Sequence, residues 1–344
     1  MIKSKNMSEL GKSLAAIGIA LLVGAVFILL SGESPIYAYS ALLKGALGSP
    51  SSIANTISKS IPLAFTGLAV ALGSRCGMLN IGAEGQLHAG AMASVLTALS
   101  LSAVLPGPIL MVVSILVGIL AGMIVGSIPG FFKAKLNTSE VIVAIMLNYI
   151  CTLFTAYLVN GPVKAQGSTA QTQVIPESVW FGRLMPKTQL TTALFLLIVA
   201  AIAMYIFLWK TSLGYQLRAV GANRSAAGTA GIKVNLFLIM SMVLSGGLAA
   251  LAGITEVFGK YHRYIEGFSP SFGFTGIAVA ILGRNHPAGV LLTALLFGIL
   301  DMGSLRMSRV TGVSTNMVTV VQSLVILLVA APELIKWTSK RKRG

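Results

Sequence analysis

Apolar segments about as long as the hydrophobic core of a bilayer recur along almost the whole chain, and short polar connections separate them. A transmembrane helix needs about 20 mostly apolar residues, so a chain of 344 residues has room for roughly ten such helices. Only 10% of the residues are charged, whereas a soluble domain carries about 25%. We therefore predict an all-α integral membrane protein with about ten transmembrane helices.

The predicted spans cover ten segments of the chain. They are residues 13–31, 57–74, 86–104, 109–130, 139–159, 190–209, 236–256, 272–283, 287–304 and 317–331. The span at 272–283 is short, and polar residues separate it from the next one, so we expect some helices to be short or broken. Non-helical backbone at membrane depth persists only where it is buried in protein or faces water. This break therefore marks either a central pathway or a tight hairpin on the inner side.

Lysine and arginine residues are unevenly distributed between the two sides of this topology. Ten spans place both termini on one side, and 16 of the 25 lysines and arginines fall on that side. Because cytoplasmic loops carry the excess of these residues, we predict that the N-terminus and the C-terminus are both cytoplasmic. Membrane topology also explains the net charge of +16 better than a nucleic-acid partner, since the basic residues are spread between apolar segments.

Two patterns concern the packing of helices. The sequence FTGLAVALGSR at 65–75 recurs as FTGIAVAILGR at 274–284, with seven identical positions of 11. The repeat indicates two related halves, with a chance match in small-residue sequence as the alternative. Glycines also recur every four residues at 118, 122, 126 and 130, a spacing that lets another helix approach closely. We favour packing inside the subunit over a seam between two subunits.

No motif for catalysis or cofactor binding occurs in the sequence. The patterns GxxxxGK[ST], HExxH and GxSxG are missing, and the three histidines, His88, His262 and His286, lie in different segments. Cys76 and Cys151 are isolated thiols. We therefore expect no enzymatic activity, no cofactor and no metal site in this chain.

The most unusual intramembrane segment is GMLNIGAEGQLHAG at 77–90. A carboxylate at the bilayer centre costs at least about 2.5 kcal/mol, so Glu84 needs a structural or functional reason. Gly82 and Gly85 flank it and would free backbone groups at a helix break. Glu84 either braces this broken helix or contacts a polar solute, and we favour the brace.

Further candidates for the pathway or for support of broken helices are polar or aromatic. They are Asn80, Gln86, Asn148, Phe272, Phe274 and Thr275. Six aromatic residues between 258 and 274 gather at the outer end of the eighth span. They would either stack on the face of a ring-containing solute or form an interfacial aromatic belt. Glu256 and Asp301 lie nearer the outer ends, and we expect them to be solvated or paired with Lys260 or Arg306.

The predicted cytoplasmic segment TSLGYQLRAVGANRSAAGTAGIK at 211–233 is short, basic and interrupted by glycines. We predict a helix near 225–230. A small-residue helix between glycine hinges is typical of a docking element for another protein, which an ordinary connector would not need. The predicted outer loop at 160–189 either docks a partner or only joins two helices.

The segment RAVGANRSAAGTAGI resembles the cytoplasmic coupling segment of permease subunits of ATP-binding-cassette (ABC) importers, in the branch that serves ribose, branched-chain amino acids and nucleosides. GMLNIGAEGQ at 77–86, EVIVAIMLNYI at 140–150 and GFTGIAVAILG at 273–283 are similar to the sub-branch for simple sugars and nucleosides. The similarity runs from about residue 13 to 331. One departure is RNHP at 284–287, which is bulkier than the glycine-rich turn of the family.

The resemblance implies that residues 1–344 form a single transmembrane permease domain of a bacterial plasma (inner) membrane importer. Nucleosides are the expected cargo, with a simple sugar such as a pentose as the alternative. Expected partners are a separate ABC ATPase, a second permease subunit, identical or paralogous, an external substrate-binding lipoprotein, and membrane lipid. From another class, an ion-coupled secondary transporter would use Glu84 or Asp301 as its ion site.

The resemblance also implies that the coupling loop at 210–235 docks with the ATPase. The residues expected to carry this contact are Gly214, Arg218, Gly221, Asn223, Ala226, Ala227 and Gly231.

Overall fold

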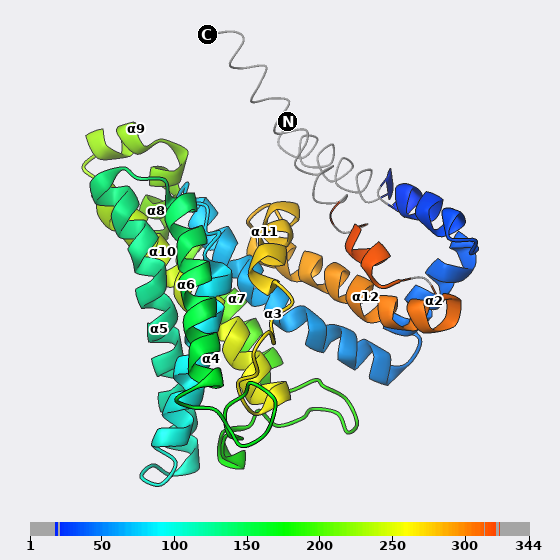
Figure 1. Ribbon diagram of the computed structural model, residues 1–344. Helices are drawn as coiled ribbons and strands as arrows, with labels where there is room; N and C mark the ends of the chain where they lie inside the picture. The colour runs from blue at the N-terminus through cyan, green and yellow to red at the C-terminus, as the bar shows by residue number, and fades with distance from the viewer. Residues whose placement is uncertain (1–17, 20, 313, 321–322, 324–344) are drawn as a thin grey trace. The chain divides into compact units, whose positions relative to one another are not determined.

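The computed structural model describes residues 18–19, 21–312, 314–320 and 323, and helices make up most of this part of the chain (Figure 1). A helix at Leu21–Leu30 comes first. The following helices are α2 (Pro35–Leu47), α3 (Pro50–Arg75), α4 (Ala83–Ser100), α5 (Gly107–Leu136), α6 (Glu140–Asn160), α7 (Ala193–Lys210), α8 (Ser212–Ala222), α9 (Arg224–Thr229), α10 (Val234–Glu256), α11 (Phe272–Leu282) and α12 (Pro287–Thr311). Two short turns, η1 (Glu177–Val179) and η2 (Val257–Tyr261), complete the set.

The chain divides into two compact units. One is Ser60–Ala294, and the other combines Met1–Lys59 with Leu295–Gly344. In the second unit, Leu21–Leu30 and α2 meet at an angle of 117°, because the helix stops in a turn before Pro35 opens α2. A small core of Ile28, Leu42 and Met307 holds these elements to α12. The sequence did not predict α2.

The all-α membrane architecture is confirmed, but the count of about ten spans is not supported. The described residues contain six helices that are long and apolar enough to cross a membrane, or seven if the bent pair counts as one. The polar start of α4 lowers its hydropathy, and α11 has only 11 residues. Most of the predicted last span at 317–331, the positive C-terminal tail and residues 1–17 lie outside the described residues.

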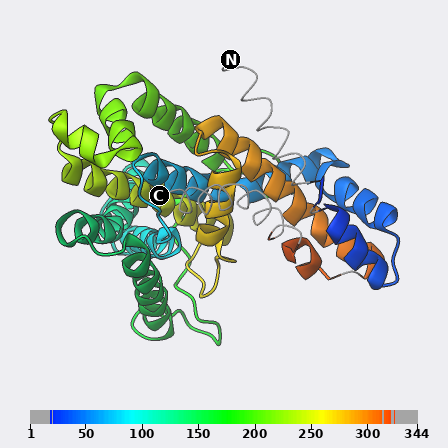
Figure 2. The same cartoon turned by 90° about the horizontal axis from the view of Figure 1, so that it is seen from above.

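The larger unit is built on a tight bundle of α4, α5 and α10 (Figures 1 and 2). The glycine stripe of α5 faces α10 and α4. A Cβ atom at Gly126 would collide with the carbonyl oxygen of Met242, and one at Gly118 would lie 2.7 Å from that of Gly90. Both partners belong to the same subunit, so the prediction that the stripe packs helices within the subunit is confirmed. The backbones come close enough for van der Waals packing without side chains between them.

The larger unit places its two long connections at opposite ends. The helices α8 and α9 lie at one end of α5 and α10, and the connection at 161–192 lies at the other (green coil, Figure 1). This connection packs on the segment after α10. Thr172 donates its backbone N–H to the Tyr264 carbonyl at 2.9 Å, and the Trp180 ring stacks on His262 with centroids 3.8 Å apart. The connection is therefore docked within its own subunit.

Candidate functional site

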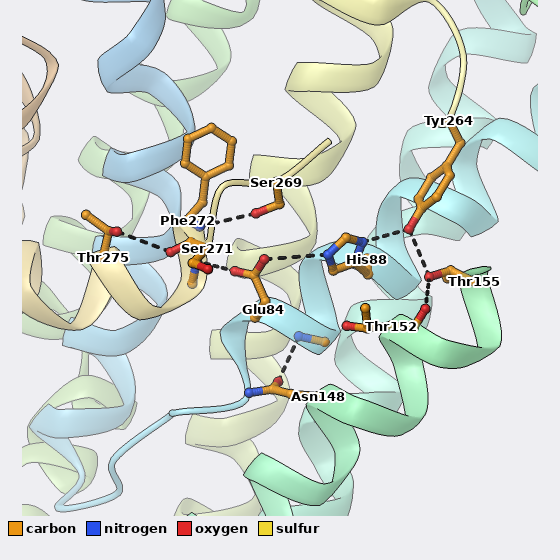
Figure 3. Close-up of polar contacts among 12 residues, drawn as sticks. Glu84, His88, Asn148, Thr152, Thr155, Tyr264, Ser269, Ser271, Phe272 and Thr275 are labelled. Carbon is orange, nitrogen blue, oxygen red and sulfur yellow. Dashed lines mark hydrogen bonds and ion pairs between the residues drawn. The ribbon is translucent and has the colours of Figure 1, made fainter. Parts of the chain in front are cut away.

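The centre of the larger unit is a meeting point of two helix starts. Glu84 is the second residue of α4 and its side chain is buried. Its Oε2 accepts a hydrogen bond from the backbone N–H of Gly273, in the first turn of α11, at 2.6 Å (Figure 3). A carboxylate at a helix N-terminus stabilises the unpaired N–H groups and the positive end of the helix dipole. A Cβ atom at position 273 would collide with the backbone of Glu84, so only glycine permits this approach.

The break before α4 is stabilised by two asparagines rather than by Glu84. Asn148 of α6 accepts from the N–H of Gly85 at 2.8 Å and donates to the carbonyl of Ile81 at 2.9 Å. Asn80 accepts from the N–H of Gly82 at 3.0 Å. Each amide therefore satisfies backbone groups that the break leaves without helical partners.

Asn80 also belongs to a buried side-chain network. It donates to Gln86 Oε1 at 2.8 Å and to the Ser245 hydroxyl at 2.6 Å, and Ser245 in turn donates to the carbonyl of Ala69. This network joins α3, α4 and α10. Because each member has a protein partner, the network fixes the relative position of these helices.

A chain of polar contacts runs from Glu84 towards the loop after α10 (Figure 3). Glu84 Oε1 lies 3.5 Å from Nε2 of His88, whose Nδ1 lies 2.7 Å from the Tyr264 hydroxyl. That hydroxyl donates to Thr155 Oγ1 of α6 at 2.9 Å. The chain of contacts therefore connects the start of α4, the loop before α11 and the second half of α6.

The turn after α11 is held from the end of α3. Arg75 donates from Nε to the carbonyl of Asn285 at 2.8 Å and from Nη2 to the carbonyl of Arg284 at 2.9 Å. Both accepting residues have a left-handed backbone, with φ of 51° at Asn285 and 57° at Arg284. Such conformations cost of order 1–3 kcal/mol each outside glycine. The bulky RNHP turn at 284–287 thus has a strained backbone, which the two hydrogen bonds from the Arg75 guanidinium stabilise.

Aromatic and basic side chains surround this turn. Arg75 and Arg218 both lie over the ring of Trp209, at 5.2 and 5.7 Å from its centroid. The His286 ring lies 4.8 Å from that of Trp209. Burial lowers the pKa of His286, and the Arg75 guanidinium lowers it further. The cluster therefore combines two guanidinium groups with an imidazole whose charged form is disfavoured.

The predicted coupling segment forms two helices at the same end of the unit. Thr211 accepts from the N–H of Gly214 and caps α8, and Asn223 accepts from the N–H of Ala226 and caps α9. A Cβ atom at Gly221 would collide with the carbonyl oxygen of Arg75. The segment is therefore seated closely on the end of α3. Its predicted helix near 225–230 is confirmed as α9, whereas α8 was not predicted.

Comparison with known proteins identifies the kind of protein. A family model described as branched-chain amino acid transport system / permease component matches residues 52–330. The chain belongs to this family. The permease is 36% identical to the nucleoside ABC transporter permease protein NupB of Lactococcus lactis, over 94% of the chain and 91% of NupB. It is also 35% identical to the guanosine ABC transporter permease protein NupP of Bacillus subtilis, over 99% of each chain.

A third relative is the glucose ABC transporter permease protein TsgB13 of Haloferax volcanii. The permease is 32% identical to it over 92% of its own length and 86% of TsgB13. The resemblance to ABC permeases that the sequence motifs indicated is thus confirmed. The permease is a multi-pass membrane protein, and an ATPase subunit is its partner.

The structure brings four of the seven predicted central residues of the permease to the start of α4. Glu84, Asn80, Gln86 and Asn148 are all buried there and hydrogen-bonded to protein groups. Phe272 is buried beside them at the start of α11, whereas 45% of Phe274 is exposed and Thr275 is half-buried. The role proposed for Glu84 changes in one respect, because it holds the N-terminus of α11 rather than its own broken helix.

The predicted aromatic group is mostly part of the core. Phe258, Tyr264, Phe268 and Phe272 are buried, Tyr261 is half-buried and Phe274 is exposed. Phe274 therefore presents the most accessible ring for stacking. Of the two alternatives for Glu256, solvation or pairing, the pairing with Lys260 is confirmed, since Lys260 Nζ lies 3.1 Å from its Oε2. Glu256 therefore differs in role from Glu84, which bonds a backbone N–H.

The predicted coupling residues of the permease differ in exposure. Ala226 and Asn223 are exposed, whereas Ala227 is only 4% exposed and Gly214 is buried. Only the exposed members can contact a partner directly. The main residues that sequence reasoning missed are His88, Arg75 and Trp209. Of these, only Arg75 had a signal in the sequence, which is the repeat that ends in Arg75 and Arg284.

Proposed function

We propose that this permease forms the translocation path of a bacterial nucleoside importer. The observation that carries the proposal is the identity of 36% and 35%, over nearly full length, to permeases named for nucleosides and guanosine. A simple sugar is the second candidate, because TsgB13, named for glucose, is 32% identical. The two classes share uncharged, hydroxyl-rich chemistry.

The charge at the centre of the permease favours uncharged cargo. Half-helix N-termini in transporters commonly bind the anionic group of a substrate. Here the N-terminus of α11 is already bonded to the carboxylate of Glu84. An amino acid carboxylate or a nucleotide phosphate would meet a like charge there. A nucleoside or a sugar carries no such group.

We assign the cargo contact to the exposed face of α11, with Phe274 and Thr275, and the support of the broken helices to Asn80, Glu84, Gln86, Asn148 and Phe272. An 11-residue helix is about 16 Å long, which is half of the 30 Å hydrocarbon core. In this assignment α11 begins near the midplane as a partial span, and α4 and α11 bring the number of membrane segments among the described residues to eight or nine. Base stacking on an aromatic ring is worth about 1–3 kcal/mol.

The proposed assembly follows from this topology. Residues 1–344 act as a single permease domain in the bacterial inner membrane, with both termini cytoplasmic and the connection at 160–189 outside. The ATPase docks on the coupling loop at 210–235 through the exposed surface of α9, where Ala226 and Asn223 lie. A second permease subunit completes the path, and an external lipoprotein delivers the cargo.

The experiment that tests this function uses the partner lipoprotein and the reconstituted complex. Purified lipoprotein is titrated with purine nucleosides, pyrimidine nucleosides, glucose and pentoses, and ATP-driven uptake of each ligand is measured in proteoliposomes. Nucleoside binding and uptake support the proposal. Binding and uptake of sugars alone would assign the permease to the second candidate, and uptake driven by an ion gradient without ATP would contradict both.

A further inference from the structure

Helix α11 is held at its two ends by residues of opposite charge from one short stretch of chain. Glu84 bonds the first turn of α11 through the N–H of Gly273 at 2.6 Å. Arg75, nine positions earlier, bonds the carbonyls that follow its last turn, at 2.8 and 2.9 Å. An anion at the N-terminus and a cation at the C-terminus both match the helix dipole. Residues 75–84 therefore act as a bracket that sets the position of α11.

The guanidinium end of this bracket also contacts the coupling segment. Arg75 lies over one part of the Trp209 ring at 5.2 Å and Arg218, of α8, lies over it at 5.7 Å. Trp209 is the penultimate residue of α7, directly before α8. A movement of α8 would therefore shift the ring against which Arg75 rests, and with it the turn that Arg75 bonds.

The bonded turn is suited to respond to such a shift. Arg284 and Asn285 are consecutive left-handed residues without glycine, a conformation that persists only where surrounding contacts hold it. No carboxylate in the described residues forms an ion pair with Arg75 or Arg218. Both cations thus depend on the Trp209 ring, and Arg75 depends also on two carbonyl oxygens, contacts that a small displacement can exchange.

We propose that Arg75 is a positioning residue that, through Trp209, transmits movement of the α8–α9 segment to α11. The inference rests on the proposed function, since it takes α8–α9 as the ATPase contact and α11 as the wall of the path. Arg75 touches neither ATP nor cargo in this account. Its loss uncouples ATP hydrolysis from transport and leaves both partners bound.

The test compares Arg75→Gln, Arg75→Lys, Trp209→Leu and the double variant Arg75→Gln/Trp209→Leu in the complete complex. ATP hydrolysis and solute uptake are measured on the same proteoliposomes, and Arg183→Gln, an exposed arginine of the outer connection, is the matched control. We expect about tenfold fewer solute molecules per ATP for Arg75→Gln, with hydrolysis within about twofold of the parent. Arg75→Lys restores little, because an ammonium lacks the planar fork.

The double variant distinguishes transmission from independent damage. Residues that act as one unit give a combined loss no larger than the single losses. Equal proportional losses of hydrolysis and uptake, or losses that multiply in the double variant, would overturn the proposal. So would full coupling in Arg75→Lys.

A second readout does not depend on the cargo. The exposed face of α11 is labelled through Phe274→Cys with a thiol reagent, with and without ATP, in the parent and in Arg75→Gln. We expect ATP to change the labelling rate at least threefold in the parent and not in Arg75→Gln. An equal response in both would refute the role of Arg75, whereas failure of nucleoside uptake alone would refute only the proposed cargo.

Discussion

The carboxylate of Glu84 accepts the backbone N–H of Gly273 at 2.6 Å, across 189 positions of the sequence. This contact joins the start of α4 to the start of α11, and it places a buried negative charge where a transporter helix would otherwise meet an anionic substrate. It therefore has two consequences. One concerns the stability of the fold, and the other concerns the charge of the cargo.

Removing the carboxylate should destabilise the permease. Glu84→Ala leaves the N–H of Gly273 buried and unpaired, which costs about 1–3 kcal/mol. Glu84→Gln keeps an oxygen acceptor and should lose less. Thermal unfolding and folded yield in detergent measure both variants. Glu140→Gln is the control, because Glu140 only pairs with Lys133 at 3.1 Å in a partly exposed site. Normal yield of Glu84→Ala with abolished uptake would instead assign Glu84 to cargo contact.

Adding one carbon atom to Gly273 should have a comparable effect. Gly273→Ala forces its Cβ against the backbone of Glu84, so α11 has to move and the hydrogen bond lengthens. We expect a lower folded yield and lower thermal stability. Gly182→Ala is the matched control, since the nearest atom to a Cβ there is 3.8 Å away. Equal stability of the two variants would contradict the close approach of α4 and α11.

The exposed surface of α9 should separate ATPase binding from folding. Ala226→Glu places a charge on an exposed position, and we expect the ATPase to be lost on co-purification while folded yield stays normal. Ala227→Glu buries a charge at a site only 4% exposed, so folded yield itself should fall. If Ala226→Glu still co-purifies with the ATPase, the docking surface lies elsewhere.

Docking of the connection at 161–192 should weaken in acid. Burial lowers the pKa of His262, and the nearby Arg183 and Arg263 lower it further. Because the folded pKa lies below the unfolded value of about 6.5, the stabilising contribution of the neutral ring is present above that pH and is lost as the pH falls. Amide hydrogen exchange at 172–181, corrected for intrinsic rates, should be faster at pH 5.5 than at pH 7.5. His262→Asn should exchange fast at both pH values, and an unchanged pH response in this variant would contradict the assignment.

Local features of the fold could be predicted from the sequence because short-range patterns encode them. The glycine stripe at 118–130, the helix after Asn223 and the pair of Glu256 with Lys260 all depend on residues within a few turns of one another. The freed backbone groups around Glu84 were also predictable, because glycines on both sides signal a break.

The partners of those groups were not predictable from one sequence. Asn148 reaches Gly85 from another helix, and Arg75 reaches the turn at Arg284 and Asn285 across more than 200 positions. Such contacts depend on how helices pack. The hydrophobic pattern of a membrane helix indicates that it lies in lipid, but it does not identify the helix that packs against it. The sequence indicated that the helix at 272–283 is short and that a break precedes α4, but it gave no indication that the N-termini of these two helices meet.

The most direct test of the account is ATP-driven uptake by the complex of permease, ATPase and lipoprotein, reconstituted in proteoliposomes. Radiolabelled guanosine and uridine are compared with glucose, ribose, leucine and guanosine monophosphate, in the parent permease and in Phe274→Ala. We expect uptake of the nucleosides and exclusion of leucine and of the nucleotide, with nucleoside uptake at least tenfold lower in Phe274→Ala. Uptake of leucine or of the nucleotide at the rate of the nucleosides would contradict this expectation.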